Sequence, residues 1–206
     1  MESWLLFIPA CLALNLTPGP DVLFILSQAL GARRGGLWAT LGLGLSYLGH
    51  TLLAVVGLSA LVMQSAAAFT LIKYLGAGYL LYLGWCSLRT ASRLTVPAAA
   101  QDSGAWRTFR RGLMVGLLNP KVALFFLAFL PQFVSVNAVP VSQQLLLLGL
   151  VFTLTATLCN GGYALMARGL QARIRVSPGV SRLTGKLSGL IMMGLGMRLA
   201  LSKAPY

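Results

Sequence analysis

Two charged residues lie inside otherwise apolar stretches of the sequence, each directly after a proline. Asp21 follows a Pro-Gly-Pro motif at 18–20, and Lys121 follows an Asn-Pro pair at 119–120. An unpaired charge at the centre of a bilayer costs about 2.5 to 3.5 kcal/mol even on lenient insertion scales, so both side chains need partners or water. Facing one cavity, they could compensate each other and hold the ammonium and carboxylate of a zwitterionic ligand. The alternative is a static ion pair that only joins two helices.

The prolines predict that both charged residues lie at breaks in helices. Proline inside a helix removes a backbone hydrogen bond and clashes with the preceding turn. Irregular backbone at membrane depth is tolerated only when it is buried in protein or lines a wet cavity, where the freed backbone groups can bind a substrate. Kinks used only for packing are the alternative. The candidate substrate-binding residues are those at the two breaks: Thr17, Pro18, Gly19, Pro20, Asp21, Asn119, Pro120 and Lys121.

The composition places these residues in a polytopic membrane protein. The chain has 206 residues, of which 57% are hydrophobic and only 9% are charged, against about 25% charged in soluble domains. At roughly 20 residues per spanning helix there is room for about six helices and no separate soluble domain. The sequence therefore predicts an all-α membrane protein with one transmembrane domain over residues 1–206.

The apolar runs and the basic residues predict the topology. Of the sixteen Lys and Arg residues, twelve lie in three connections, at 33–34, 89–111 and 168–186, whereas the alternate connections are uncharged. The positive-inside rule places the basic connections in the cytoplasm and both termini outside. Arg198 and Lys203 argue mildly against this topology, and a five-span chain is the alternative. The six predicted spans cover residues 4–30, 37–63, 69–88, 112–134, 144–166 and 183–201.

An internal repeat relates the two halves of the chain, about 1–90 and 112–206, which are joined by the cytoplasmic loop at 89–111. A shift of one hundred residues lays Pro20 of PGPDVLFIL on Pro120 of NPKVALFFL, so that Asp21 falls on Lys121. Three spans per half give inverted halves, related by a pseudo-two-fold axis in the membrane plane. The two breaks then face the same layer of the bilayer.

Three polar residues are secondary candidates for the site, and each lies in the second helix of its half. His50 lies in the first half, and Asn160 and Tyr163 lie in the second. A lone histidine in an apolar helix is more often a hydrogen-bonded packing residue than a proton relay.

Glycine pairs and excess positive charge give expectations about partners. Gly112 and Gly116, like Gly185 and Gly189, permit close helix approach, either inside the bundle or across a homodimer interface. The net charge of +13 does not indicate nucleic-acid binding, because the basic residues lie between apolar runs rather than on an amphipathic face. The expected partners are a small-molecule substrate, protons and the lipid bilayer.

Several motifs in the same order resemble the LysE/RhtB family of bacterial amino-acid exporters. They are NLTPGPDVLFIL at 15–26, the glycine-rich helix ending in His50, IKYLGAGYLLYLG at 72–84, and the stretch at 109–133 containing NPKVALFFLAFLPQF. The resemblance implies a six-span protein of the bacterial inner membrane that exports amino acids or related metabolites, using the proton gradient. The family's motif elements fall on Pro18, Gly19, Pro20, Asp21, Asn119, Pro120 and Lys121. Family substrates range from basic to branched-chain amino acids, so membership does not identify the cargo.

The scarcity of acidic residues favours a neutral amino acid as the cargo. Besides Asp21, the acidic residues are Glu2 at the terminus and Asp102 in the predicted loop, so a basic substrate would lack a second carboxylate.

We expect alternating access, with Asp21 as the candidate proton carrier. A metal-cation transporter, which is an alternative, would need more carboxylate or thiolate ligands than Asp21 and the cysteines at 11, 86 and 159 supply. An intramembrane enzyme would need a nucleophile beside a base, and neither that spacing nor a metal-ligand motif appears. No cofactor or metal is expected.

Overall fold

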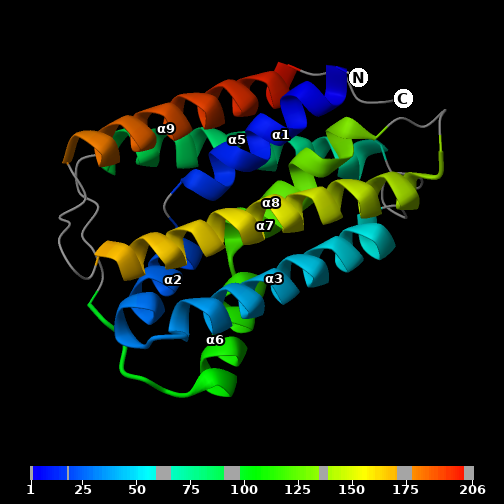
Figure 1. The fold of residues 1–206 in the computed structure, drawn as a ribbon. Helices are drawn as coiled ribbons and strands as arrows, with labels where there is room; N and C mark the ends of the chain where they lie inside the picture. Colours follow the sequence, from blue (N-terminus) through cyan, green and yellow to red (C-terminus); the bar gives the residue numbers. More distant parts are fainter. Residues whose placement is uncertain are drawn as a thin grey trace.

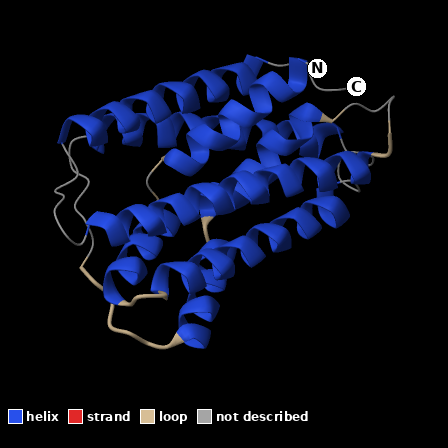
Figure 2. Cartoon of the chain, viewed as in Figure 1, coloured by secondary structure: helices blue, strands red, loops and turns tan. Residues whose placement is uncertain are grey.

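The computed structural model describes residues 2–17, 19–58, 66–90, 98–134, 139–170 and 178–201, and all regular structure within them is helical (Figures 1 and 2). Pro18, one of the predicted site residues, lies outside the described residues. The helices are α1 Glu2–Leu16, α2 Pro20–Gly31, α3 Gly35–Leu53 with the π-helical turn η1 Ala54–Leu58, α5 Ala66–Thr90, α6 Ala105–Leu117, α7 Pro120–Leu124 with the π-helical turn η2 Phe125–Phe129 and the 3-10 turn η3 Leu130–Phe133, α8 Val141–Leu170 and α9 Pro178–Leu201.

The breaks predicted in the first and fourth helices are confirmed. The axes of Leu6–Leu16 and Pro20–Gly31 differ by 54°, and those of Ala105–Leu117 and Pro120–Phe133 differ by 44°. In both cases the second segment begins at its proline. Proline suits this position because its fixed φ matches the helix and the missing N–H would have no partner there. Each break therefore starts a new helix and places the following charged residue in its first turn.

The fourth helix begins seven residues earlier than predicted, at Ala105 instead of residue 112. Its first turns lie in the stretch predicted as a cytoplasmic loop. These turns are amphipathic: Thr108 and Gly112 are buried, whereas Arg107 and Arg110 are exposed. Arginine can stay in a helix against an apolar neighbour while its charged end reaches water, so polar composition alone was a poor indicator of a loop here.

Two helices are long and apolar enough to cross a membrane, and up to four spans result if each bent pair is one span, counting described residues only. The two unbroken helices cover Gly35–Gly57 and Val141–Ala167. The predicted total of six spans, arranged as an inverted repeat, stays a prediction.

Equivalent helices of the two predicted halves lie side by side. The helix α5 packs along α9, and α3 packs against α6 and α8, while α1 contacts both α8 and α9. In Figure 1 the start of α1, the end of α9 and the start of α8 lie at one end of the bundle. The ends of α2, α5 and α8 and the starts of α3 and α9 lie at the other end. The predicted basic connections thus follow or precede helix ends that lie together.

The glycine pairs singled out in the sequence pack inside the bundle. A Cβ at Gly116 would overlap Ser46 of α3, and one at Gly189 would lie 2.8 Å from the carbonyl oxygen of Gly84 in α5. Small residues of this kind allow the backbones of membrane helices to approach closely. These contacts account for the two glycine pairs within one chain, and the homodimer stays a prediction.

A cluster of phenylalanines packs directly behind the second break. The ring of Phe125 lies 5.1 Å from that of Phe152 in α8, and the ring of Phe7 in α1 lies 5.0 Å from that of Phe133. Such aromatic pairs add about 0.5 to 1.5 kcal/mol each beyond their buried area. The cluster therefore fixes the position of the broken fourth helix relative to α1 and α8.

Gly76 and Gly78 of α5 offer a test of this packing. In Gly76→Ala the new methyl would overlap the Cβ of Ala128 in η2, whereas in Gly78→Ala it would meet no atom within 4 Å. Overpacking of this kind costs about 1 to 3 kcal/mol, so we expect Gly76→Ala to lower the free energy of unfolding by that amount. Gly78→Ala is expected to be neutral or slightly stabilising through helix propensity. The measurement is unfolding of both purified variants in detergent, and equal stability of the two would contradict the close approach.

Candidate functional site

Asp21 and Lys121 form an ion pair at the point where the two broken helices meet. The Nζ of Lys121 lies 3.2 Å from Oδ1 of Asp21, and the side chains are only 4% and 2% exposed. Removing two charges from water is costly, and their attraction offsets that cost only when further hydrogen bonds satisfy the charged groups. The surroundings of the pair therefore decide whether it is stable.

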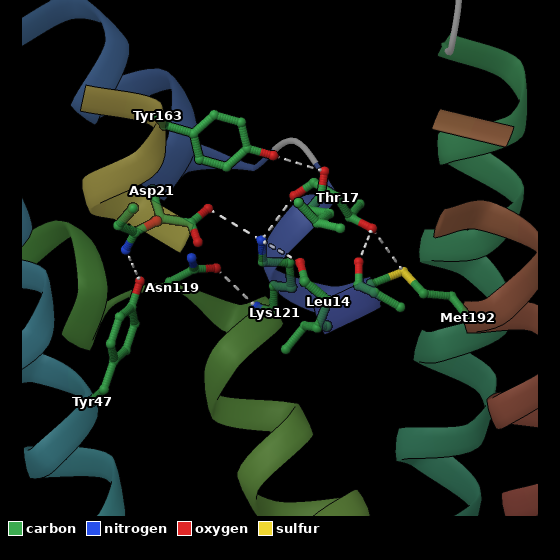
Figure 3. A network of polar contacts seen from close by, with 11 residues as sticks. Leu14, Thr17, Asp21, Tyr47, Asn119, Lys121, Tyr163 and Met192 are labelled. Atoms are coloured by element: carbon green, nitrogen blue, oxygen red, sulfur yellow. Dashed lines mark hydrogen bonds and ion pairs between the residues drawn. The ribbon is translucent and has the colours of Figure 1, made fainter. Parts of the chain in front are cut away.

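The first break supplies those hydrogen bonds to the lysine. The Nζ of Lys121 donates to the carbonyl oxygens of Thr17 at 3.1 Å and Leu14 at 3.3 Å, in addition to Asp21 (Figure 3). Carbonyls in the last turn of a helix have no partner within that helix, and α1 ends at Leu16. The three protons of the ammonium thus meet three acceptors from the first break. These acceptors form a binding set for a cation, and Lys121 occupies it.

The second break positions Lys121 and leaves a buried donor beside it. The side-chain oxygen of Asn119 accepts a hydrogen bond from the backbone N–H of Lys121 at 3.0 Å and caps the start of α7. Among the described residues, Nδ2 of Asn119 and Nδ2 of Asn15 are buried without a hydrogen-bond partner. Each unsatisfied buried donor costs about 1 to 3 kcal/mol, and such groups call for an explanation. A ligand carboxylate would satisfy the donor on Asn119.

Gly19 gives the ion pair the space that it needs. Its φ of −147° is extended backbone, which any residue can adopt. A Cβ built at Gly19, however, would lie 2.8 Å from Oδ1 of Asp21 and 2.9 Å from Nζ of Lys121. The glycine therefore leaves room for the close approach of the charged groups, whereas its backbone conformation would suit any residue.

Two tyrosines connect α8 to the same region. The hydroxyl of Tyr163 donates to the carbonyl oxygen of Leu16 at 3.2 Å, and Nδ2 of Asn160 donates to the hydroxyl of Tyr47 at 2.9 Å. Figure 3 shows Tyr163 and Tyr47 on the two sides of Asp21. The secondary candidates Asn160 and Tyr163 thus lie close to the site, and each joins α8 to an element of the first half.

His50 contacts the turn that precedes the second break. Its Nε2 is 3.1 Å from the carbonyl oxygen of Gly116, one turn before the second break, and its ring lies 5.7 Å from that of Phe126. The histidine is therefore hydrogen-bonded between α3 and α6. This geometry agrees with a packing residue better than with a proton relay.

The structure separates the roles of the residues predicted at the breaks. Gly19, Asp21, Asn119 and Lys121 meet around the ion pair, together with the backbone of Thr17. The rings of the prolines at 20 and 120 are exposed, so these residues act by starting helices. Within the described residues, no three His, Cys, Asp or Glu side chains gather where they could hold a metal ion.

Four further groups at the site were not predicted from the sequence: the side chains of Tyr47 and Asn15 and the carbonyl oxygens of Leu14 and Leu16. Tyr47 carried a usable signal, because it lies three residues before His50 and so shares a helix face with it. The carbonyl oxygens carried none, since every residue has one and only the position of the break exposes these.

Comparisons with known proteins agree over nearly the full chain. A family model described as LysE type translocator matches residues 12–203. An uncharacterized membrane protein of Vibrio cholerae is 34% identical and covers 99% of both chains. YrhP, an uncharacterized membrane protein of Bacillus subtilis, is 31% identical over 98% of this chain and 100% of its own. A homoserine/homoserine lactone efflux protein of Salmonella typhimurium is 30% identical over 97% of this chain and 96% of its own. No solved structure matches the chain.

Proposed function

The chain belongs to the LysE type translocator family, and we propose that it is a secondary transporter that exports a neutral amino acid or a related metabolite from the cytoplasm. The observation that carries this proposal is the buried pair of Asp21 and Lys121, which joins two broken helices. The Salmonella relative named as a homoserine/homoserine lactone efflux protein supports a small cargo of the amino-acid type. Family membership favours a transporter over an intramembrane enzyme or a structural subunit.

A zwitterion can replace the internal ion pair without leaving any charge unpaired. The substrate's ammonium would take the place of Lys121 against Asp21 and the carbonyl oxygens of Leu14 and Thr17. Its carboxylate would then accept hydrogen bonds from Nζ of Lys121 and from the unpartnered Nδ2 of Asn119. The pair is neutral as a whole and so is the substrate, which means that the charge of the buried site is the same when it is empty and when it is loaded. The Asp21–Lys121 pair is thus replaced by two pairs, ammonium with Asp21 and carboxylate with Lys121, and no buried charge is left alone.

The same charge count favours neutral over basic amino acids. A lysine or arginine substrate would bring a second positive charge into the site, where Asp21 is already engaged. Of the other two acidic residues, Asp102 is exposed in the segment before α6, and Glu2 is the second residue of the chain. Neither position suits a partner for the substrate's side chain.

The proposed mechanism is alternating access by two inverted halves of one transmembrane unit. Each half would contain a broken helix followed by two further spans, with α5 and α9 as the third and sixth. At 25 and 24 residues these helices are about 36 Å long, enough to cross a hydrocarbon core of about 30 Å. Rocking one half against the other would expose the ion pair first to the cytoplasm and then to the outside.

The proposed orientation places the basic connections in the cytoplasm and both termini outside the bacterial inner membrane. It is supported by the arrangement in Figure 1, where the ends of α2, α5 and α8 and the starts of α3 and α9, all next to basic connections, lie at one end of the bundle. Arg33 and Arg34, exposed between α2 and α3, belong to that end. Basic residues accumulate on the cytoplasmic side of membrane proteins.

Efflux from bacterial cells stripped of their own amino-acid exporters tests the proposal. The cells are loaded with amino acids as dipeptides and carry the wild type, the control variant Arg33→Gln or an empty vector. The amino acids released into the medium are then identified and measured. We expect selective release of neutral amino acids by the first two. Release of only lysine or arginine would contradict the neutral cargo, and no release from cells that contain the protein in their membrane would contradict amino-acid export.

Gly19→Ala is expected to impair export more than stability. Its new methyl would press on the far ends of Asp21 and Lys121, which can move, so the free energy of unfolding should fall by only about 1 kcal/mol. Separation of the charged groups should lower the initial rate of efflux about tenfold, which corresponds to about 1.4 kcal/mol. Gly194→Ala is the control, because a Cβ there meets no atom within 4 Å. A normal rate in Gly19→Ala would show that the close approach is not needed.

A further inference from the structure

A pocket of about 600 Å³ lies on the outer face of α6, apart from the ion pair. Three arginines line it, Arg107, Arg110 and Arg111, together with the apolar side chains of Phe24 from α2 and Met114 from α6. Trp106 completes the rim. The pocket thus combines a concentrated positive charge with an apolar wall.

The positive charge of this pocket is not balanced by carboxylates in the part of the chain that the structure describes. All three arginines are exposed, and no described carboxylate lies within ion-pair distance of them. Asp102, the nearest acidic residue in the sequence, accepts a hydrogen bond from the backbone N–H of Gly104 at 3.0 Å. Arginine forks match phosphate oxygens in geometry as well as in charge, so an anionic phosphate ester suits the arginines.

The apolar wall indicates an amphiphile rather than a soluble anion. Trp106 is 68% exposed and stacks on Phe109 with ring centroids 5.5 Å apart, and Met114 is 51% exposed. A free phosphate would use the arginines and leave these side chains in water. Tryptophan beside arginine on an amphipathic helix is typical of segments that lie at the membrane surface.

The pocket lies at the end of the bundle that carries the basic connections. Just before α6, the N–H of Ala100 donates to the carbonyl oxygen of Ser27 at 3.0 Å, and Thr108 donates to Gln28 of α2 at 3.4 Å. The start of α6 is thereby held against the last turns of α2, next to Arg33 and Arg34. In the proposed orientation, headgroups of the cytoplasmic leaflet would lie at this level.

We propose that this pocket binds the headgroup of an anionic phospholipid. Arg107, Arg110 and Arg111 would hold the phosphodiester, while the first part of the acyl chains would pass over Trp106 and Met114. Bound lipid would hold the start of the broken helix that carries Lys121 against the membrane surface. Lipid binding at this position is independent of the identity of the transported substrate.

Quenching of Trp106 by brominated lipids tests the proposal on the full chain. The tryptophans at 4, 38 and 85 are replaced by phenylalanine, and the protein is reconstituted in phosphatidylcholine containing a minor, equal fraction of brominated phosphatidylglycerol or brominated phosphatidylcholine. We expect the anionic lipid to quench much more strongly. Arg110→Gln/Arg111→Gln should lower the affinity for phosphatidylglycerol relative to phosphatidylcholine roughly 30-fold, and Arg107→Gln alone should lower it about fivefold. The control Arg33→Gln/Arg34→Gln changes an adjacent exposed pair at the same end and should keep the preference for phosphatidylglycerol.

Three results would overturn this assignment. The first is equal quenching by the two brominated lipids, and the second is an equal loss of preference in the two double variants, which would indicate general surface attraction. The third is relief of quenching by millimolar glycerol phosphate, which would assign the pocket to a soluble phosphate ester. If the double variant does not fold, the single variant Arg107→Gln decides between the outcomes.

Discussion

Lys121→Met is expected to destabilise the protein by about 3 to 5 kcal/mol and to abolish export. The variant leaves the Asp21 carboxylate, only 2% exposed, without its counter-charge, and a buried charge that loses its partner carries a cost of this size. The carbonyl oxygens of Leu14 and Thr17 lose the Lys121 donor at the same time, and that of Leu14 keeps the N–H of Thr17. The measurements are unfolding in detergent and efflux normalised to the amount of protein in the membrane. Lys186→Met, which removes an exposed lysine of α9, should stay within about 0.5 kcal/mol of the wild type.

The double variant Asp21→Asn/Lys121→Met separates a transport role from a structural one. Removal of both charges leaves no ion buried at this site, so most of the lost stability should return. Export should not return, because neither end of the zwitterion would find a charged partner. A double variant that regains both stability and export would show that the ion pair is a static connection between the halves and that the substrate binds elsewhere.

The positions of the two breaks and their charges could be predicted because their signals are local. A proline inside an apolar run interrupts any helix, and a charge beside it needs a partner wherever the helix lies. The match of Asp21 to Lys121 in the internal repeat went further and predicted their meeting across one hundred residues. The structure confirms that the two residues meet, at 3.2 Å.

The surroundings of the pair could not be predicted in the same way. Lys121 binds backbone carbonyl oxygens of Leu14 and Thr17, and these acceptors depend on where α1 ends and on the 54° bend between α1 and α2. Gly19 was singled out as part of a helix break, but its need for close approach to Lys121 is a property of the packed structure.

The start of the fourth helix could not be predicted from hydrophobicity because its first turns contain three arginines. Composition favoured a loop up to residue 111, because Arg107, Arg110 and Arg111 interrupt the hydrophobic pattern. The helix nevertheless begins at Ala105, since one face of its first turns packs against α2 and α3 while the arginines extend outward. The sequence signal of these turns is therefore their helical periodicity and not their mean hydropathy.

Asp21→Asn is expected to abolish export against a concentration gradient while leaving exchange of substrate across the membrane. Protonation of Asp21 would break the ion pair, and this is the step by which a proton gradient could release Lys121 and drive the halves between their two states. Asparagine can still accept the hydrogen bond from Lys121, and the carbonyl oxygens of Leu14 and Thr17 remain in place. The buried ammonium keeps its three acceptors but loses its counter-charge, so the free energy of unfolding should also fall in this variant. It cannot take up a proton, however, so movement of substrate should no longer depend on the proton gradient.

Proteoliposomes loaded with substrate distinguish coupling from binding at Asp21. The wild type should accelerate export when a pH gradient is imposed, whereas Asp21→Asn should show the same exchange rate with and without the gradient. Asp21→Glu keeps a protonatable carboxylate on a longer side chain and should recover part of the response. Proton-driven export by Asp21→Asn at the wild-type rate would contradict a role of Asp21 in proton coupling. Loss of both export and exchange in a folded Asp21→Asn would show that binding of the substrate's ammonium needs the negative charge of Asp21 and not only its hydrogen-bond acceptor.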